Sequence, residues 1–79
     1  MTKEQIFAKV KELIVNELSV DAEKVTMDAT FESDLGADSL DAIEMITAVE
    51  SEFGVTIPDE EAMNLRTVGS IVEFVEKNQ

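Results

Sequence analysis

Hydrophobic residues near the N-terminus recur at the spacing of an amphipathic α-helix. They share one helix face and are Ile6, Val10, Leu13, Ile14 and Leu18. Thr2 and Gln5 have the spacing of a capping box, in which each side chain satisfies a free backbone N–H of the first turn. The pattern predicts a helix over residues 3–17.

A second apolar face predicts a helix over residues 39–53. The residues that share this face are Ala42, Met45, Ile46, Val49 and Phe53. Asp38 or Ser39 can supply the oxygen that caps the first turn. Gly54 follows directly, as is typical of a left-handed C-terminal cap. This helix is therefore bounded at both ends by recognisable signals.

Two further helices are predicted in the last third of the chain. Pro58 ends an extended piece at residues 55–57, and three acidic residues after it favour the positive end of a short helix dipole. Thr67 is placed to cap a final helix. The apolar face of that helix repeats at i, i+3, i+4 and i+7 and consists of Val68, Ile71, Val72 and Val75.

Residues 18–38 lack a regular apolar period, so we expect a long ordered loop there. Asp21 to Lys24 can form one helical turn, and scattered apolar residues can hold the loop over the core. A loop of this length is uncommon in a small domain. The predicted fold is nevertheless an all-α four-helix bundle, with three main helices, one short helix and the long loop between the first two helices.

The length and composition favour one domain that spans residues 1–79. Hydrophobic residues make up 44% of the chain, which is ordinary for a globular domain. Cys and His are absent, so disulfides and transition-metal sites of the usual kind are not expected. The first eleven residues lack the apolar run of a signal peptide, and we expect a cytoplasmic or organelle-matrix protein, with the cytoplasm as the first choice.

The chain is strongly acidic, with 18 Asp and Glu against 6 Lys and Arg and a formal net charge of −12. Nucleic acid and membrane insertion are therefore not expected, whereas basic patches on partner proteins are. On the second predicted helix, Leu40 lies off the apolar face and close to Glu44. Leu40 is thus a candidate exposed anchor among acids.

Ser39 is the candidate functional residue, although a simple first-turn or capping role explains most serines in this position. A serine hydrolase is not indicated, because the chain has no His and the residues around Ser39 do not form G-x-S-x-G. Asp34, Asp38 and Asp41 do not have EF-hand spacing, so no dedicated metal site is expected. A helix N-terminus does favour a phosphate, which Asp38 and Asp41 would partly oppose.

Three stretches of the chain resemble the acyl carrier proteins of bacterial-type fatty acid synthesis. They are Asp34-Leu35-Gly36-Ala37-Asp38-Ser39-Leu40-Asp41, Phe53-Gly54-Val55-Thr56-Ile57-Pro58-Asp59-Glu60-Glu61 and Arg66-Thr67-Val68-Gly69. The resemblance implies that Ser39 carries 4′-phosphopantetheine through a phosphodiester. The thiol of that arm would hold acyl chains as thioesters. A chain without Cys would then import its reactive sulfur, and it would not itself be an enzyme.

The resemblance also implies two sets of functional residues. Those expected to recognise partners are Asp38, Leu40, Asp41, Glu44 and Glu50. Those expected to line a pocket for the acyl chain are Phe31, Ala42, Met45, Ile46, Ile57, Ala62, Leu65 and Ile71. The implied partners are basic patches of fatty acid synthesis enzymes and a phosphopantetheinyl transferase, and the carrier is expected to be a monomer.

Two alternatives remain open from the sequence. One is a carrier of the same fold that serves polyketide, lipid A or D-alanine-transfer pathways. The other is an unmodified acidic module that binds basic proteins, in which Ser39 only caps a helix. Ser39→Ala would abolish the activity of a carrier but barely affect such a module.

Overall fold

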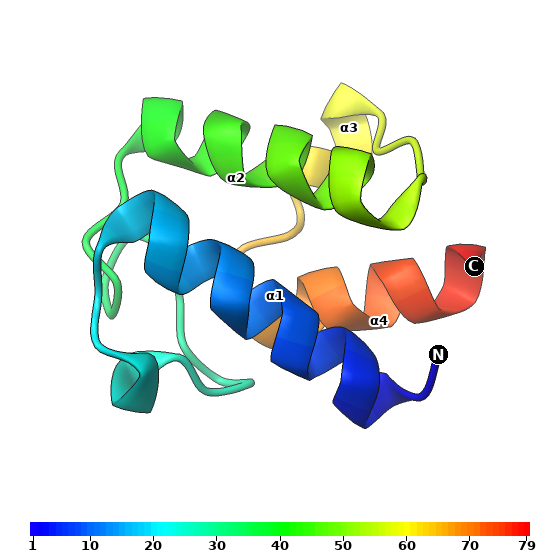
Figure 1. Ribbon diagram of the computed structural model, residues 1–79. Helices are drawn as coiled ribbons and strands as arrows, with labels where there is room; N and C mark the ends of the chain where they lie inside the picture. The colour runs from blue at the N-terminus through cyan, green and yellow to red at the C-terminus, as the bar shows by residue number, and fades with distance from the viewer.

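The computed structural model describes residues 1–79 and is entirely helical apart from its loops (Figure 1). Helix α1 spans Lys3–Leu18 and is followed by a short 3₁₀ helix, η1, at Ala22–Lys24. Helix α2 spans Ser39–Phe53 and helix α3 spans Asp59–Ala62. Helix α4 spans Val68–Asn78. The predicted all-α fold, with three main helices and one short helix, is confirmed.

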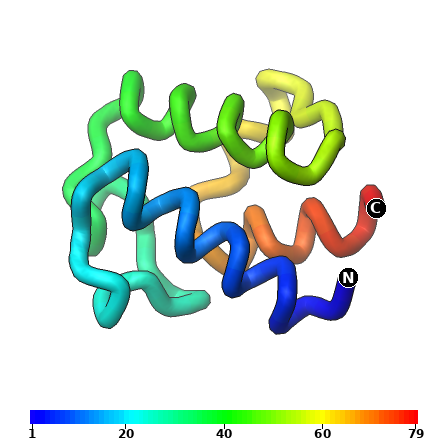
Figure 2. The backbone as a smooth tube through the Cα atoms, in the orientation of Figure 1, coloured from blue at the N-terminus to red at the C-terminus, as the bar shows by residue number.

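Helix α1 packs against both α2 and α4, and it crosses in front of α4 in Figure 1. The backbone trace shows the chain ends lying close together (Figure 2). The Met1 ammonium donates a hydrogen bond to Gln79 Oε1 at 2.9 Å. No helix is both long enough and apolar enough to cross a membrane.

The core consists of buried side chains from the three long helices and the long loop, together with Ile57 from the segment between α2 and α3. The helices contribute the apolar faces that the sequence pattern predicts. The buried core residues are Ile6, Val10, Ile14, Val25, Ala29, Phe31, Leu35, Ala37, Met45, Val49, Ile57, Val68, Ile71, Val72 and Val75. No polar or charged residue is buried, so the acidic side chains all remain in contact with water.

Each long helix begins with a capping box, which satisfies backbone N–H groups that the first turn leaves free. The reciprocal pairs are Thr2 with Gln5, Asp38 with Asp41 and Thr67 with Ser70. At the start of α2 the cap is therefore Asp38, and Ser39 is the first helical residue. Gly54 ends α2 with a φ of 65°, a left-handed conformation that favours glycine.

The long loop after α1 is held to the start of α4 by backbone hydrogen bonds. The amides of Val68 and Gly69 donate to the carbonyls of Ala29 and Met27, at 3.0 Å and 2.9 Å. Thr30 also forms an isolated antiparallel β-bridge with Thr67. The predicted turn at residues 21–24 is present as η1. Long-range bonds to α4 thus explain how a loop without a helical period remains ordered.

Candidate functional site

Ser39 lies at the exposed N-terminus of α2. The side chains on either side of it cap the helix. The Asp41 amide donates to Asp38 Oδ1 at 2.9 Å, and the Asp38 amide donates to Asp41 Oδ2 at 3.3 Å. The serine side chain takes no part in this cap, and Ser39 is exposed to solvent.

A largely apolar cavity of about 820 Å³ opens beside Ser39, which is one of its lining residues. The cavity lies among the loop, α2, α3 and the residues that lead into α4. Nine of its 15 lining residues are hydrophobic. The lining residues are Thr30, Phe31, Glu32, Ser33, Ser39, Ala42, Ile43, Met45, Ile46, Asp59, Ala62, Met63, Leu65, Arg66 and Ile71.

Seven of the eight residues predicted to line an acyl pocket lie in the wall of this cavity. They are Phe31, Ala42, Met45, Ile46, Ala62, Leu65 and Ile71. Ile57, the eighth, is buried in the core and is not among the residues that line this cavity. Its amide donates to Glu50 Oε2 at 2.8 Å, which fixes this residue beside the C-terminal half of α2, away from Ser39.

Besides Ser39, seven lining residues were not among those predicted from the sequence: Thr30, Glu32, Ser33, Ile43, Asp59, Met63 and Arg66. Ile43 and Met63 are large apolar side chains that are 62% and 74% exposed, and both border the cavity. Arg66 is the cation of the lining. The helical period of α2 places Ile43 off the buried face, so the sequence gives no sign that it borders a cavity. Met63 and Arg66 lie outside regular helix, where periodicity gives no signal.

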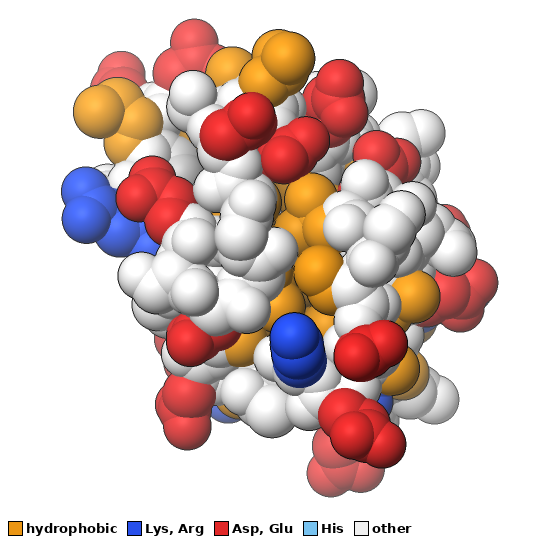
Figure 3. Space-filling view, turned by 90° about the vertical axis from the view of Figure 1, so that its left-hand side faces the viewer, with side chains coloured by type: hydrophobic (Ala, Val, Ile, Leu, Met, Phe, Trp, Pro, Cys, Tyr) orange, Lys and Arg blue, Asp and Glu red, His pale blue; other side chains and the backbone are white.

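The residues predicted to recognise partners follow the surface of α2. Leu40 is 64% exposed, and Asp38 and Glu44 are exposed beside it. Asp41 and Glu50 are half-buried, and each accepts a hydrogen bond from a backbone amide of this chain. Figure 3 views the side of the molecule on which α2 begins, and acidic side chains are spread over this face around patches of hydrophobic ones. Glu50 therefore has a structural role whether or not a partner contacts it.

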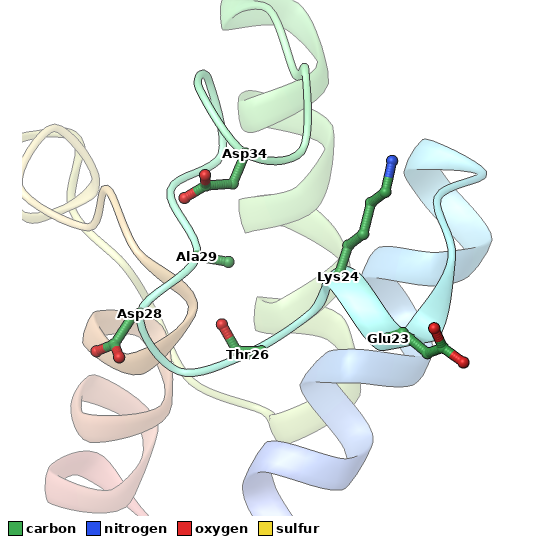
Figure 4. Close-up of a pocket in the computed structure, with 6 residues that line it drawn as sticks. All are labelled: Glu23, Lys24, Thr26, Asp28, Ala29 and Asp34. Carbon is green, nitrogen blue, oxygen red and sulfur yellow. The ribbon is translucent and has the colours of Figure 1, made fainter.

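A second hollow of about 300 Å³ lies along the loop and is polar (Figure 4). Its carboxylates belong to Glu23, Asp28 and Asp34, and Figure 4 shows that they do not converge on a common point. Asp34 Oδ2 already accepts hydrogen bonds from the amide and hydroxyl of Thr30, at 2.8 Å and 3.2 Å. No group of acidic side chains in the chain is arranged to hold a metal ion.

The site thus combines an exposed hydroxyl, a helix N-terminus and an adjoining apolar cavity. The helix N-terminus suits a phosphate on that hydroxyl, and the cavity suits an apolar chain attached beyond the phosphate. No His or Cys exists to activate Ser39 as a nucleophile. These features are compatible with a group attached covalently to the hydroxyl, and a phosphopantetheine arm fits them.

Comparison with known proteins agrees with this description. Residues 8–75 match the family described as the phosphopantetheine attachment site. The structure of the acyl carrier protein from Enterococcus faecalis is similar, with a TM-score of 0.83 and 37% sequence identity over 100% of both chains. The chain therefore belongs to the phosphopantetheine-bearing acyl carrier proteins. Its cofactor is 4′-phosphopantetheine, and it is a carrier and not an enzyme.

Proposed function

We propose that Ser39 is the attachment residue and that the chain carries growing acyl groups between the enzymes of fatty acid biosynthesis. The observation that supports this most strongly is the shared location of Ser39 and the apolar cavity. A group esterified to Ser39 begins at the cavity mouth. When bound, the arm supplies a thiol on which acyl groups are held as thioesters.

The start of α2 prepares Ser39 for modification. Ser39 is exposed, so a phosphopantetheinyl transferase can reach its hydroxyl without unfolding the helix. The capping box holds Asp38 and Asp41 on each other's amides and thereby fixes the first turn around the serine. The positive end of the helix dipole favours the phosphodiester at this position.

The cavity supports a role in sheltering the acyl chain. Its wall comes from Met45, Ile46 and Ile71 on two long helices, and from Ala62 and Leu65 around α3. Methionine and short aliphatic side chains adapt to a guest more readily than large aromatic ones. An acyl chain that enters this cavity leaves water and stabilises the fold that binds it.

The surface of α2 supports docking onto basic patches of the synthesis enzymes and of the transferase. Leu40 is exposed next to exposed acids, which offers an apolar contact inside a ring of negative charge. A net charge of −12 also steers the chain toward basic partners. On this proposal the carrier works as a cytoplasmic monomer, and Asp38, Leu40, Asp41, Glu44 and Glu50 form the docking surface.

The experiment that tests this function is reconstitution with purified fatty acid synthesis enzymes. The holo protein should be acylated and extended in two-carbon steps, and the Ser39→Ala variant should fold but carry nothing. Loading with D-alanine by a D-alanine ligase, with no elongation, would instead favour a carrier of a related pathway. Binding to basic partners without any modification of Ser39 would favour the acidic interaction module.

A further inference from the structure

Arg66 is the cation that lines the same cavity as Ser39. The other basic residues are elsewhere: three are on α1, one is in η1 and one is in the last turn of α4. They are Lys3, Lys9, Lys11, Lys24 and Lys77. In a chain with three times as many acids as bases, the only arginine thus lines the cavity that Ser39 also lines.

The backbone of Arg66 is fixed at its carbonyl and at the residue that follows it. Its carbonyl accepts a hydrogen bond from the Phe31 amide at 3.1 Å, and Phe31 is itself buried in the cavity wall. The next residue, Thr67, caps α4 and forms the β-bridge with Thr30. The guanidinium therefore extends from an anchored point in the wall, so that binding a ligand orders the side chain but not the backbone.

Arg66 has no partner within the chain despite the surrounding acids. The one ion pair within 4.0 Å joins Lys3 of α1 and Glu73 of α4. Arg66 is exposed, so its guanidinium remains free to meet an anion that is delivered to the cavity. A guanidinium forms paired hydrogen bonds with phosphate oxygens more readily than an ammonium does.

A phosphodiester on Ser39 would be such an anion. It would add a negative charge next to Asp38 and Asp41, and like charges this close oppose each other. The cavity lining adds two further carboxylates, from Glu32 and Asp59. A nearby cation would therefore stabilise this phosphate more than it would stabilise a phosphate at a helix N-terminus without such carboxylates.

We propose that Arg66 is the counter-ion of the phosphodiester on Ser39 and donates guanidinium hydrogen bonds to its oxygens. This inference rests on the proposed function, because it requires that Ser39 be modified. The ion pair would draw the start of the arm toward the α3–α4 side of the cavity mouth. Arg66 would thus act as a positioning residue for the arm.

The test compares the apo and holo forms of the wild type, Arg66→Gln, Arg66→Lys and Lys24→Gln. Lys24→Gln is the matched control, since it removes one exposed positive charge that lies outside the cavity. Far-ultraviolet circular dichroism of the apo forms checks that each variant folds. Each form is then melted, and the ³¹P spectrum of each holo form is recorded at low and high salt.

We expect the change in Tm on modification to be about 3 °C less favourable in Arg66→Gln than in the wild type and Lys24→Gln. The ³¹P resonance should move only in the Arg66 variants, and less in Arg66→Lys than in Arg66→Gln. High salt should reduce both effects.

The outcomes separate the two proposals. If a phosphopantetheinyl transferase and coenzyme A leave Ser39 unmodified, both the carrier function and the role of Arg66 are refuted. If Ser39 is modified but Arg66→Gln behaves like Lys24→Gln in both Tm and ³¹P spectrum, only the role of Arg66 is refuted.

Discussion

Attaching an octanoyl group to the holo protein should raise its Tm, because the acyl chain replaces water in the apolar cavity. About seven apolar carbons at ~0.8 kcal/mol each would give roughly 6 kcal/mol if all were fully buried. The cavity is bordered by Ile43 and Met63, which are 62% and 74% exposed, so we expect less than half of this. About 2 kcal/mol in a domain of this size corresponds to a rise in Tm on the order of 10 °C.

The assay is thermal unfolding of the holo and octanoyl forms, followed by circular dichroism. Ala42→Leu adds bulk to the cavity wall and should remove most of the increase. Ala48→Leu is the matched control, because Ala48 is also half-buried on α2 but does not line the cavity. Equal Tm values for the holo and octanoyl wild type would refute the pocket, as would a full increase in Ala42→Leu.

Three further predictions concern the scaffold. A Cβ on Gly69 would lie 2.9 Å from the Met27 carbonyl oxygen, which is too close. Gly69→Ala should therefore lower the free energy of unfolding by about 1–3 kcal/mol in a urea titration. An unchanged midpoint of that titration would count against this contact. Glu50→Ala should lower the free energy of unfolding by about 1 kcal/mol, because the Ile57 amide loses its acceptor. Glu50→Gln keeps an acceptor and should unfold like the wild type. An equal loss of stability in the two variants would show that the charge of Glu50 matters and not only its hydrogen bond. Millimolar Mg²⁺ should raise Tm more than NaCl of equal ionic strength, because it relieves repulsion among 18 acids, and equal effects would refute specific relief by divalent ions.

The sequence predicts the long helices well because their signals are local. The apolar face and the capping pair of α1 both lie within its own residues, and the structure begins this helix at Lys3 as predicted. The same holds for α4, which begins after the Thr67 cap. Leu40 was predicted to be exposed from the helical projection alone, and it is 64% exposed.

The loop and the cavity could be predicted only in part, because both depend on contacts between distant residues. Hydrogen bonds from the loop to α4 order it, and no local pattern indicates such pairing. Seven of the eight residues that the resemblance implied for a pocket lie in the cavity wall, whereas Ile57 lies beside Glu50, whose carboxylate accepts a hydrogen bond from its amide. The resemblance also did not include Met63 and Arg66, which line the cavity. Both lie outside regular helix, where the neighbours of a residue depend on tertiary contacts and not on a local sequence pattern.

The central claim is that Ser39 carries the phosphopantetheine arm. The most direct test is an intact-mass and peptide spectrum of the chain from its native cells, under conditions that preserve thioesters. The account predicts phosphopantetheine on Ser39, with attached acyl groups that differ by two-carbon units. An unmodified Ser39, in cells that contain a working phosphopantetheinyl transferase, would contradict it.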